Sequence, residues 1–313
     1  MINISGLTFD YQGHRALHQV SFSIEKGSVT ALVGPNGAGK TTLMRCIAGL
    51  ETPLLGTITV ADINVMEHPR EVHRMLGYLS DFFGLYQELT VAQCFEYAAA
   101  SQGVPEHSIQ QAIQTTAYQL EISDRLHQAT GSLSRGLRQR VAIGQAIIHS
   151  PKVLLLDEPA SGLDPEARFS LALLFRKLQA EGMTLLVSSH ILAELDEYSS
   201  HMLALRDGRI LDYRALGDQA QRHAEPFKRM MIALAQPDKT LGAHLSSHAG
   251  VVLKTNSATH AEFDFSGEPA EQAALLSSMI ASGFSVMCFT EHKENLQDSY
   301  LSSLKSRLGD EHA

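Results

Sequence analysis

The chain of 313 residues is short of several features, and each shortage excludes a class of protein. Its three cysteines, Cys46, Cys94 and Cys288, are odd in number and widely spaced, and none forms a CxxC pair. A disulfide framework and a cysteine-based zinc site are therefore not expected, whereas a reducing compartment is. No apolar run approaches the roughly 18 residues of a membrane-spanning helix. No basic and apolar leader opens the sequence, which favours a cytosolic protein.

Positive charge is also scarce, because 25 lysines and arginines face 34 aspartates and glutamates and leave a formal net charge of −9. Binding to nucleic acid through net charge requires a positive field, so no nucleic-acid partner is expected. The 15 histidines are scattered, and most of them are expected to be solvated or to cap turns. Hydrophobic residues at 44% indicate a globular protein, and the chain is long enough for two domains.

Short apolar segments alternate with helical patterns over the first two thirds of the chain. Four of these segments are typical of buried parallel strands, namely 29–33, 153–156, 184–187 and 202–205. Helical periodicity follows the first strand, covers about 88–150, and returns over about 165–181. This alternation predicts an α/β domain over residues 1–220, with a mostly parallel sheet between helices.

The pattern changes after about residue 220. Strands are predicted near 230–235, 250–254, 261–265 and 284–290, and helices near 268–282 and 294–307. Residues 221–313 are therefore predicted to form a small α+β domain.

A glycine-rich segment, GPNGAGKT, matches the pattern G-x-x-x-x-G-K-[ST] between a predicted strand and a predicted helix. Glycines let backbone N–H groups surround phosphate oxygens, and the helix adds the positive end of its dipole. Lys40 supplies a charge for the β- and γ-phosphates, and Thr41 offers a hydroxyl to Mg²⁺. We therefore predict a nucleotide site made by Gly34, Pro35, Asn36, Gly37, Ala38, Gly39, Lys40, Thr41 and Thr42.

Two adjacent carboxylates follow the apolar strand 153–156. Asp157 stands at the predicted carboxyl end of that strand, where it is well placed to hold Mg²⁺ beside the phosphate loop. Glu158 can orient and deprotonate a water for attack on the γ-phosphate. The pair predicts hydrolysis of a nucleoside triphosphate.

Five further segments follow the same order as in one known family. They are Tyr11, Gly77–Asp81 (GYLSD), Leu133–Leu137 (LSRGL), Ser161–Asp164 (SGLD), and Ser189 with His190. With the phosphate loop, this set resembles the nucleotide-binding subunit of ATP-binding cassette (ABC) transporters over about residues 2–212. In that order they correspond to the aromatic that stacks on adenine, the glutamine loop, the signature sequence, the D-loop and the switch histidine.

The resemblance implies a P-loop NTPase fold with a RecA-like sheet core, an antiparallel β subdomain and a helical subdomain over about 82–150. It implies that two copies, or one copy and a paralogous ATPase subunit, form a head-to-tail dimer around ATP. Ser134 and Gly136 would then reach the γ-phosphate held by the other subunit. His190 would sense that phosphate within its own subunit, and Tyr11 would stack on adenine.

Two departures from the family pattern alter the expected chemistry. In the signature, Arg135 and Leu137 replace the usual glycine and glutamine, and Arg135 would either face phosphate or pair with an acidic neighbour. Asp81 stands where the glutamine is expected, and as an anion it can ligate Mg²⁺ but also repels the γ-phosphate. Gln87 is the alternative, although the Gly-Tyr-Leu frame favours Asp81.

The resemblance further implies an ATPase that powers transport through a separate polytopic membrane subunit, at the cytoplasmic face of the inner membrane. Phe82, Phe83, Leu85 and Tyr86 would receive that subunit or pack inside the helical subdomain. The C-terminal domain resembles extensions of exporter subunits, so export is expected. The alternatives are a soluble ABC ATPase acting on ribosomes or DNA and an unrelated P-loop kinase or GTPase.

Overall fold

The computed structural model describes residues 1–82, 84–189, 191–216, 227–291, 296 and 300. The chain divides into two compact units, Met1–Leu216 with Leu296–Ala313, and Gly217–Asn295. Leu296 is fully buried in the first unit, where its N–H donates to Asp196 Oδ1 at 3.1 Å. This return to the first unit was not predicted, because residues after 220 were all expected in the second domain.

A six-stranded sheet forms the centre of the first unit, in the order β10-β9-β3-β8-β7-β6. Five strands are parallel and β10 pairs antiparallel with β9. The strands are β3 (Val29–Val33), β6 (Leu76–Leu79), β7 (Val153–Asp157), β8 (Thr184–Ser189), β9 (His201–Arg206) and β10 (Arg209–Ala215). The predicted parallel sheet is confirmed.

The central strands contribute to two cores because their side chains alternate between the faces of the sheet. In β7, Leu154 and Leu156 pack on the side of the helices, whereas Val153 and Leu155 face the second core. All four are fully buried. Burial on both faces explains why these strands are apolar throughout.

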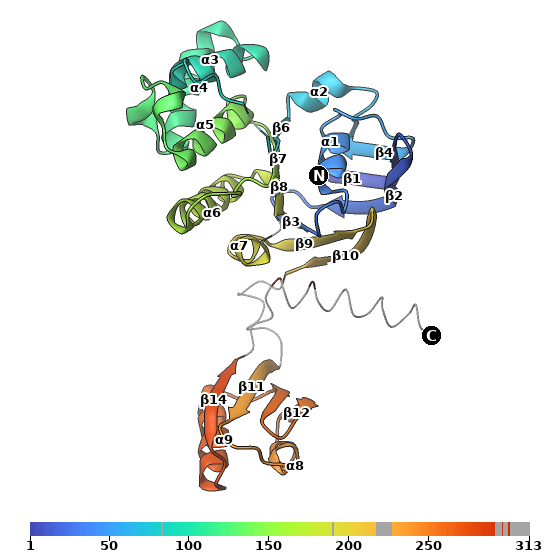
Figure 1. The fold of residues 1–313 in the computed structure, drawn as a ribbon, viewed down its shortest axis with the longest axis vertical. Coiled ribbons are helices and arrows are strands. Elements are labelled where there is room, and N and C mark those ends of the chain that lie inside the picture. The colour runs from blue at the N-terminus through green and yellow to red at the C-terminus, as the bar shows by residue number, and fades with distance from the viewer. Residues whose placement is uncertain (83, 190, 217–226, 292–295, 297–299, 301–313) are drawn as a thin grey trace. The chain divides into compact units, whose positions relative to one another are not determined.

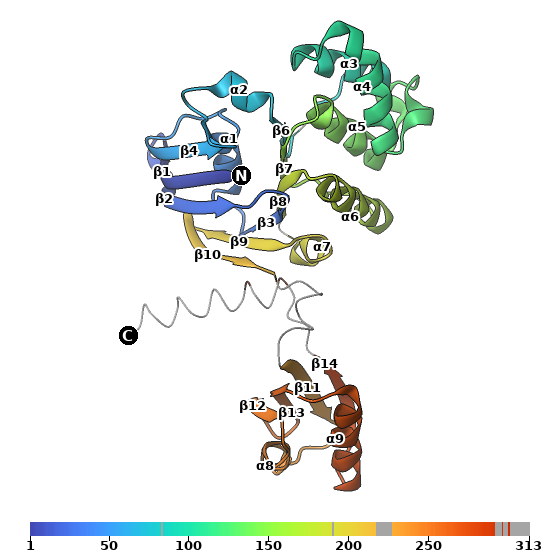
Figure 2. The same cartoon turned by 180° about the vertical axis from the view of Figure 1, so that it is seen from behind.

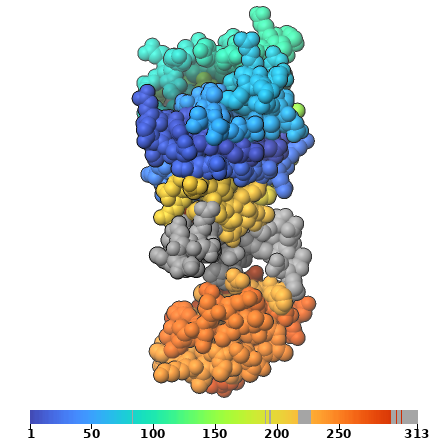
Figure 3. Space-filling view, turned by 90° about the vertical axis from the view of Figure 1, so that its right-hand side faces the viewer, coloured from blue at the N-terminus to red at the C-terminus, as the bar shows by residue number. Residues whose placement is uncertain are grey.

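The second core lies between the central sheet and a four-stranded antiparallel sheet in the order β2-β1-β4-β5. Helix α1 (Lys40–Ile47) lies between the two sheets, and α2 (Pro69–His73) precedes β6 (Figures 1 and 2). The strands are β1 (Ile2–Tyr11), β2 (His14–Ile24), β4 (Leu55–Val60) and β5 (Ile63–Asn64). In Figure 3 this antiparallel sheet forms a continuous blue surface on one side of the first unit.

Helices cover the opposite face of the central sheet (Figure 1). Thr90 begins the helical subdomain with a capping box, in which its hydroxyl accepts from Gln93 N and its own N–H donates to Gln93 Oε1. The helices there are α3 (Val91–Ser101), α4 (Glu106–Gln119), α5 (Arg135–Ile147), and the 3-10 turns Ser123–Arg125 and Thr130–Ser132. Next to them lie α6 (Pro165–Ala180) and α7 (Leu192–Asp196).

The second unit has the order βαββαβ and one antiparallel sheet, β12-β13-β11-β14. This connectivity and strand order are those of a ferredoxin-like fold. Its elements are β11 (Lys228–Leu234), α8 (Leu241–Ser246), β12 (Val251–Asn256), β13 (His260–Phe265), α9 (Pro269–Ala281) and β14 (Val286–Glu291). The four strands and the helix near 268–282 are confirmed, and the helix expected over 294–307 lies almost wholly outside the described residues.

Among the described residues, no helix combines the length and the apolar character needed to cross a membrane.

Candidate active site

The phosphate loop connects β3 to α1, and two of its glycines are required by close approach of the backbone. A Cβ on Gly34 would collide with the carbonyl oxygen of Leu205 in β9. Gly39 has φ of +102°, and a Cβ there would lie 2.8 Å from the carbonyl oxygen of Ala16. The loop therefore keeps its backbone open at the N-terminus of α1, where N–H groups and the helix dipole favour an anion.

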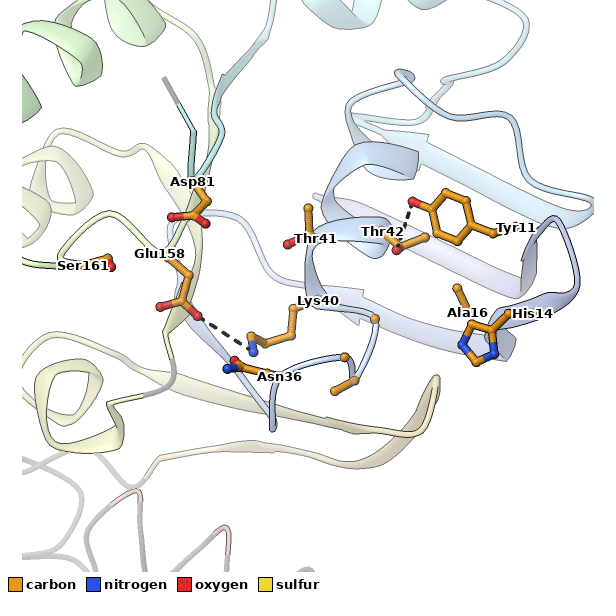
Figure 4. Close-up of a pocket in the computed structure, with 13 residues that line it drawn as sticks. Tyr11, His14, Ala16, Asn36, Lys40, Thr41, Thr42, Asp81, Glu158 and Ser161 are labelled. Atoms are coloured by element: carbon orange, nitrogen blue, oxygen red, sulfur yellow. Dashed lines mark hydrogen bonds and ion pairs between the residues drawn. The ribbon is translucent and has the colours of Figure 1, made fainter. Parts of the chain in front are cut away.

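Lys40 is held in place by the loop that it follows. Its Nζ donates to the carbonyl oxygens of Gly34 at 2.8 Å and Pro35 at 3.3 Å. It also lies 3.8 Å from Glu158 Oε1, and the Lys40 side chain is only 7% exposed (Figure 4). A nearly buried ammonium of this kind can exchange one of its oxygen neighbours for a phosphate oxygen, with which it forms a strong charged hydrogen bond.

A cavity of about 490 Å³ opens over the phosphate loop (Figure 4). This volume is within the range of small-molecule sites, which is roughly 300–1,000 Å³. Asp81 lines the cavity. Gln87, the alternative to Asp81, does not line it, and its backbone carbonyl accepts a hydrogen bond from the N–H of Gly131. The lining residues are Tyr11, His14, Ala16, Asn36, Gly37, Ala38, Gly39, Lys40, Thr41, Thr42, Asp81, Glu158 and Ser161.

Asp157 is buried at the end of β7, directly before Glu158, which lines this cavity. Its Oδ1 accepts a hydrogen bond from Ser188 Oγ at 2.6 Å. Its Oδ2 is buried and has no hydrogen-bond partner among the described residues. A buried carboxylate oxygen without a donor is costly unless a cation or its water satisfies it, so Asp157 fits a Mg²⁺ site. The described residues contain no cluster of three or more acidic, histidine or cysteine ligands.

Glu158 follows with a backbone that turns sharply out of the strand. Its φ is +50°, in the left-handed region that non-glycine residues rarely adopt. Its N–H donates to Ser188 Oγ at 2.9 Å. Ser188 thus holds both carboxylate residues, although no sequence motif predicted it. Its place directly after the apolar segment 184–187, at the same edge of a parallel sheet, is the signal that could have indicated it.

Tyr78 in β6 is a buried phenol at this edge of the sheet. Burial, with a further contribution from the charge of Asp157, raises the pKa of Tyr78 to about 12. The phenol therefore stays neutral, and its Oη is buried without a hydrogen-bond partner among the described residues.

Tyr11 lies at the mouth of the cavity. Its Oη is 3.4 Å from Thr42 Oγ1, and its ring packs edge-on against Phe9 with centroids 4.9 Å apart. The side chain remains 45% exposed, which leaves a ring surface open for stacking.

The signature residues lie apart from the phosphate loop. Ser134 caps α5, and its Oγ accepts from Leu137 N at 3.3 Å. A Cβ on Gly136 would lie 3.3 Å from Ala167 Cβ, so the first turn of α5 packs against the first turn of α6. Ser134, Gly136 and Asp164 line a separate cavity of about 240 Å³ and not the cavity over the phosphate loop. The structure therefore brings the loop, Asp81 and Glu158 together in one cavity, whereas Asp157 and the signature do not line it.

Two predicted residues are outside the described part of the chain. His190 follows directly after β8, which ends at Ser189, and Phe83 follows Phe82.

Comparisons with known proteins agree on one family. The family model described as ABC transporter matches residues 17–161. The ABC transporter ATP-binding protein NatA of Bacillus subtilis is 35% identical over 203 residues, which are 64% of this chain and 82% of NatA. YxlF of the same organism, an uncharacterized ABC transporter ATP-binding protein, is 29% identical and matches 96% of this chain and 98% of its own length. The sn-glycerol-3-phosphate import ATP-binding protein UgpC of Chromohalobacter salexigens is 31% identical over 82% of this chain and 69% of UgpC.

Solved structures give the same result. An ATP-binding subunit of an ABC transporter superposes with a TM-score of 0.62 at 29% identity, over 72% of this chain and 93% of that chain. The cbiO1 protein of Clostridium perfringens, part of an ABC transporter complex, has a TM-score of 0.62 at 26% identity, over 72% of this chain and 90% of that chain. The P-loop fold, the order of its subdomains and these relatives lead to one conclusion: the chain belongs to the ABC transporter family as an ATP-binding subunit, and it is an ATPase.

Proposed function

We propose that this chain hydrolyses ATP at a site shared by two subunits and thereby drives transport through a separate membrane subunit. The separation of the signature cavity from the phosphate-loop cavity carries this proposal. Each chain then supplies the phosphate loop, Asp157 and Glu158 to one ATP, and Ser134 and Gly136 to the ATP of its partner. A head-to-tail dimer satisfies both requirements with one symmetric interface.

The residues divide the chemistry among themselves. Backbone N–H groups of residues 36–42 and the Lys40 ammonium bind the phosphates, and Tyr11 stacks on the adenine. Glu158 accepts a proton from the attacking water, and His190 contacts the γ-phosphate. Thr41, Asp157 and Asp81 would hold Mg²⁺, which supplies positive charge to the β- and γ-phosphates when bound. Ser134 of each chain donates a hydrogen bond from its hydroxyl to the γ-phosphate of the ATP bound by the partner.

Glu158→Gln tests the shared site. The amide cannot accept the proton, so hydrolysis should fall by roughly 10²–10⁴-fold while ATP binding persists. Because ATP is then retained, size-exclusion chromatography with light scattering should show a dimer with ATP and a monomer without it. Glu181→Gln, at the C-terminal cap of α6, is the matched control and should behave as the wild type. A monomer of Glu158→Gln at saturating ATP would contradict the proposal.

The helical subdomain offers a docking site for the membrane subunit. A cavity of about 560 Å³ lies beside α4 and is lined by residues 102–105, by residues 148–150 at the end of α5, and by Arg74. In the same subdomain, the Tyr86 and Tyr97 rings pack edge to face and are 64% and 61% exposed. Phe82 is 96% exposed. Exposed aromatics are typical of protein interfaces, and a groove suits a short helix of a partner. The chain would then sit at the cytoplasmic face of the membrane.

Export is the direction we propose, whereas the relatives UgpC, PotA and MetN are named as import ATP-binding proteins. The second unit supports export because its single antiparallel sheet with two helices differs from the β-barrel-like tail of many importer subunits. Inverted membrane vesicles that contain the complete transporter, tested with lipophilic fluorescent dyes, should accumulate dye when ATP is added. ATP-dependent loss of dye would oppose export.

A further inference from the structure

Arg135 connects two segments that the sequence places far apart. It is the first residue of α5, directly after Ser134, and its Nη2 donates to the carbonyl oxygen of Ser161 at 2.8 Å. Ser161 belongs to the turn 158–164 that leads from β7 to α6. The start of the signature helix is therefore tied to the turn that begins with Glu158.

Gly162 provides the surface on which the guanidinium rests. A Cβ on Gly162 would collide about equally with Cζ and both terminal nitrogens of Arg135. Nearly equal approach to three atoms of one plane means that the guanidinium lies flat against this glycine. Gly162 also has φ of +67°, so the turn uses glycine both for its backbone and for the space above it.

Stability of α5 does not account for an arginine at this position. A cation in the first turn of a helix opposes the helix dipole, and the first turn of α5 contains no acidic residue. The favourable interaction of Arg135 is therefore the one with the turn 158–164, where a charged donor meets a backbone carbonyl.

The same turn takes part in the nucleotide site of its own subunit. Glu158 and Ser161 both line the cavity over the phosphate loop. The N–H of Ser161 donates to the carbonyl oxygen of Glu158 at 3.1 Å, so a shift at Ser161 is passed to Glu158. Glu158 has a positive φ of +50°, which is unfavourable for a residue other than glycine. A shift at Ser161 can therefore either stabilise this conformation or let Glu158 leave it.

We infer that Arg135 is a positioning residue that couples the two ATP sites of the dimer. This inference rests on the proposed function, which gives Glu158 to one site and Ser134 to the other. Phosphate bound at Ser134 orders the first turn of α5. Through the hydrogen bond of Arg135 to Ser161, the ordered first turn also holds the backbone of Ser161 and Glu158 in the same chain. ATP at the partner's site thus favours the catalytic position of Glu158 at the chain's own site.

Hydrogen exchange on the nucleotide-free chain tests the connection itself. In Arg135→Ala, amides of the turn 158–164 should exchange faster than in the wild type, because the turn loses its tie to α5. Arg125→Ala, at a partly exposed arginine in the 3-10 turn Ser123–Arg125, is the control and should leave exchange in the turn 158–164 unchanged. Unchanged exchange in Arg135→Ala would overturn the inference.

The dependence of hydrolysis on ATP concentration tests the coupling. The wild type should give a sigmoidal curve, and Arg135→Ala a hyperbolic curve with a maximal rate about tenfold lower, as expected for loss of a charged hydrogen bond. Gly162→Ala should act in the same way, because its Cβ displaces the guanidinium. The double variant should be no worse than the worse single variant, since both remove one interaction.

The outcomes separate the inference from the proposed function. If Arg135→Ala keeps the sigmoidal curve while Glu158→Gln still dimerises with ATP, the coupling is overturned and the shared site stands. Additive losses in the double variant would also overturn the coupling. If Glu158→Gln does not dimerise, the shared site fails and the coupling fails with it.

Discussion

Ser188 gives two adjacent carboxylate residues different tasks. Its hydroxyl donates to Asp157 Oδ1, and the same oxygen accepts the N–H of Glu158. The Asp157 side chain is thereby held at the edge of the sheet, where the residue is only 1% exposed. The Glu158 side chain instead turns toward Lys40 in the cavity. Asp157 is suited to bind a cation, and Glu158 is suited to accept a proton from a water.

Lys40→Ala tests the binding of phosphate at the level of a single residue. The variant loses the buried charge that faces the β- and γ-phosphates, so ATP should bind more weakly and hydrolysis should fall by about a hundredfold or more. Hydrolysis is measured by phosphate release and binding by titration with a fluorescent ATP analogue. Lys26→Ala, an exposed lysine before β3, is the control. Hydrolysis at the wild-type rate in Lys40→Ala would contradict the assignment of the loop.

At the scale of elements, the second unit contains an ion cluster on adjacent strands. Asp264 in β13 lies 3.0 Å from Lys254 Nζ and 3.3 Å from Arg229 Nε, and its side chain is 18% exposed. Burial raises the pKa of Asp264, but the hydrogen bonds and charges of Lys254 and Arg229 outweigh burial and lower the pKa below its usual value. The cluster joins β11, β12 and β13 across the sheet.

Asp264→Asn should destabilise the second unit at neutral pH by ~1 kcal/mol. Because the folded pKa lies below the unfolded one, the ionised carboxylate stabilises the fold above the unfolded pKa of about 3.9, and this stabilisation is lost as pH falls further. Differential scanning calorimetry of the full chain should therefore show a lower unfolding temperature for the variant near neutral pH and no difference in strong acid. The exposed Asp207→Asn is the control. A difference that is independent of pH would contradict this account.

The elements that the sequence predicted are those with local signals. Four apolar segments became β3, β7, β8 and β9, because strands buried on both faces are apolar throughout. The phosphate loop was predicted because glycine spacing and one lysine are themselves the requirement of the site. The bond of Arg135 to Ser161 and the shared role of Ser188 were not predictable, because each joins residues 26 or more positions apart. Such pairs follow from helix packing and strand order, which short patterns do not specify.

At the scale of the whole molecule, the exposed aromatics predict a partner. Tyr86→Ala should reduce recovery of a polytopic membrane protein when the tagged chain is isolated from gently solubilised native membranes. Interface aromatics cost about 1–4 kcal/mol when truncated, so recovery should fall at least several-fold. ATP binding should be unchanged. Tyr118→Ala is a matched control, since Tyr118 is 75% exposed on α4 but lies beneath Lys177 Nζ. Equal recovery with Tyr86→Ala would contradict the docking site.

Complementation between two inactive variants tests the shared ATP site most directly. Lys40→Ala disables the phosphate loop, and Ser134→Arg blocks the signature, so each variant alone should hydrolyse almost no ATP. In a mixed head-to-tail dimer, both defects fall in one site and the other site is intact. Activity should therefore return when the two purified variants are mixed. If mixed dimers form and remain inactive, or if Ser134→Arg is active alone, the site is not shared in this way.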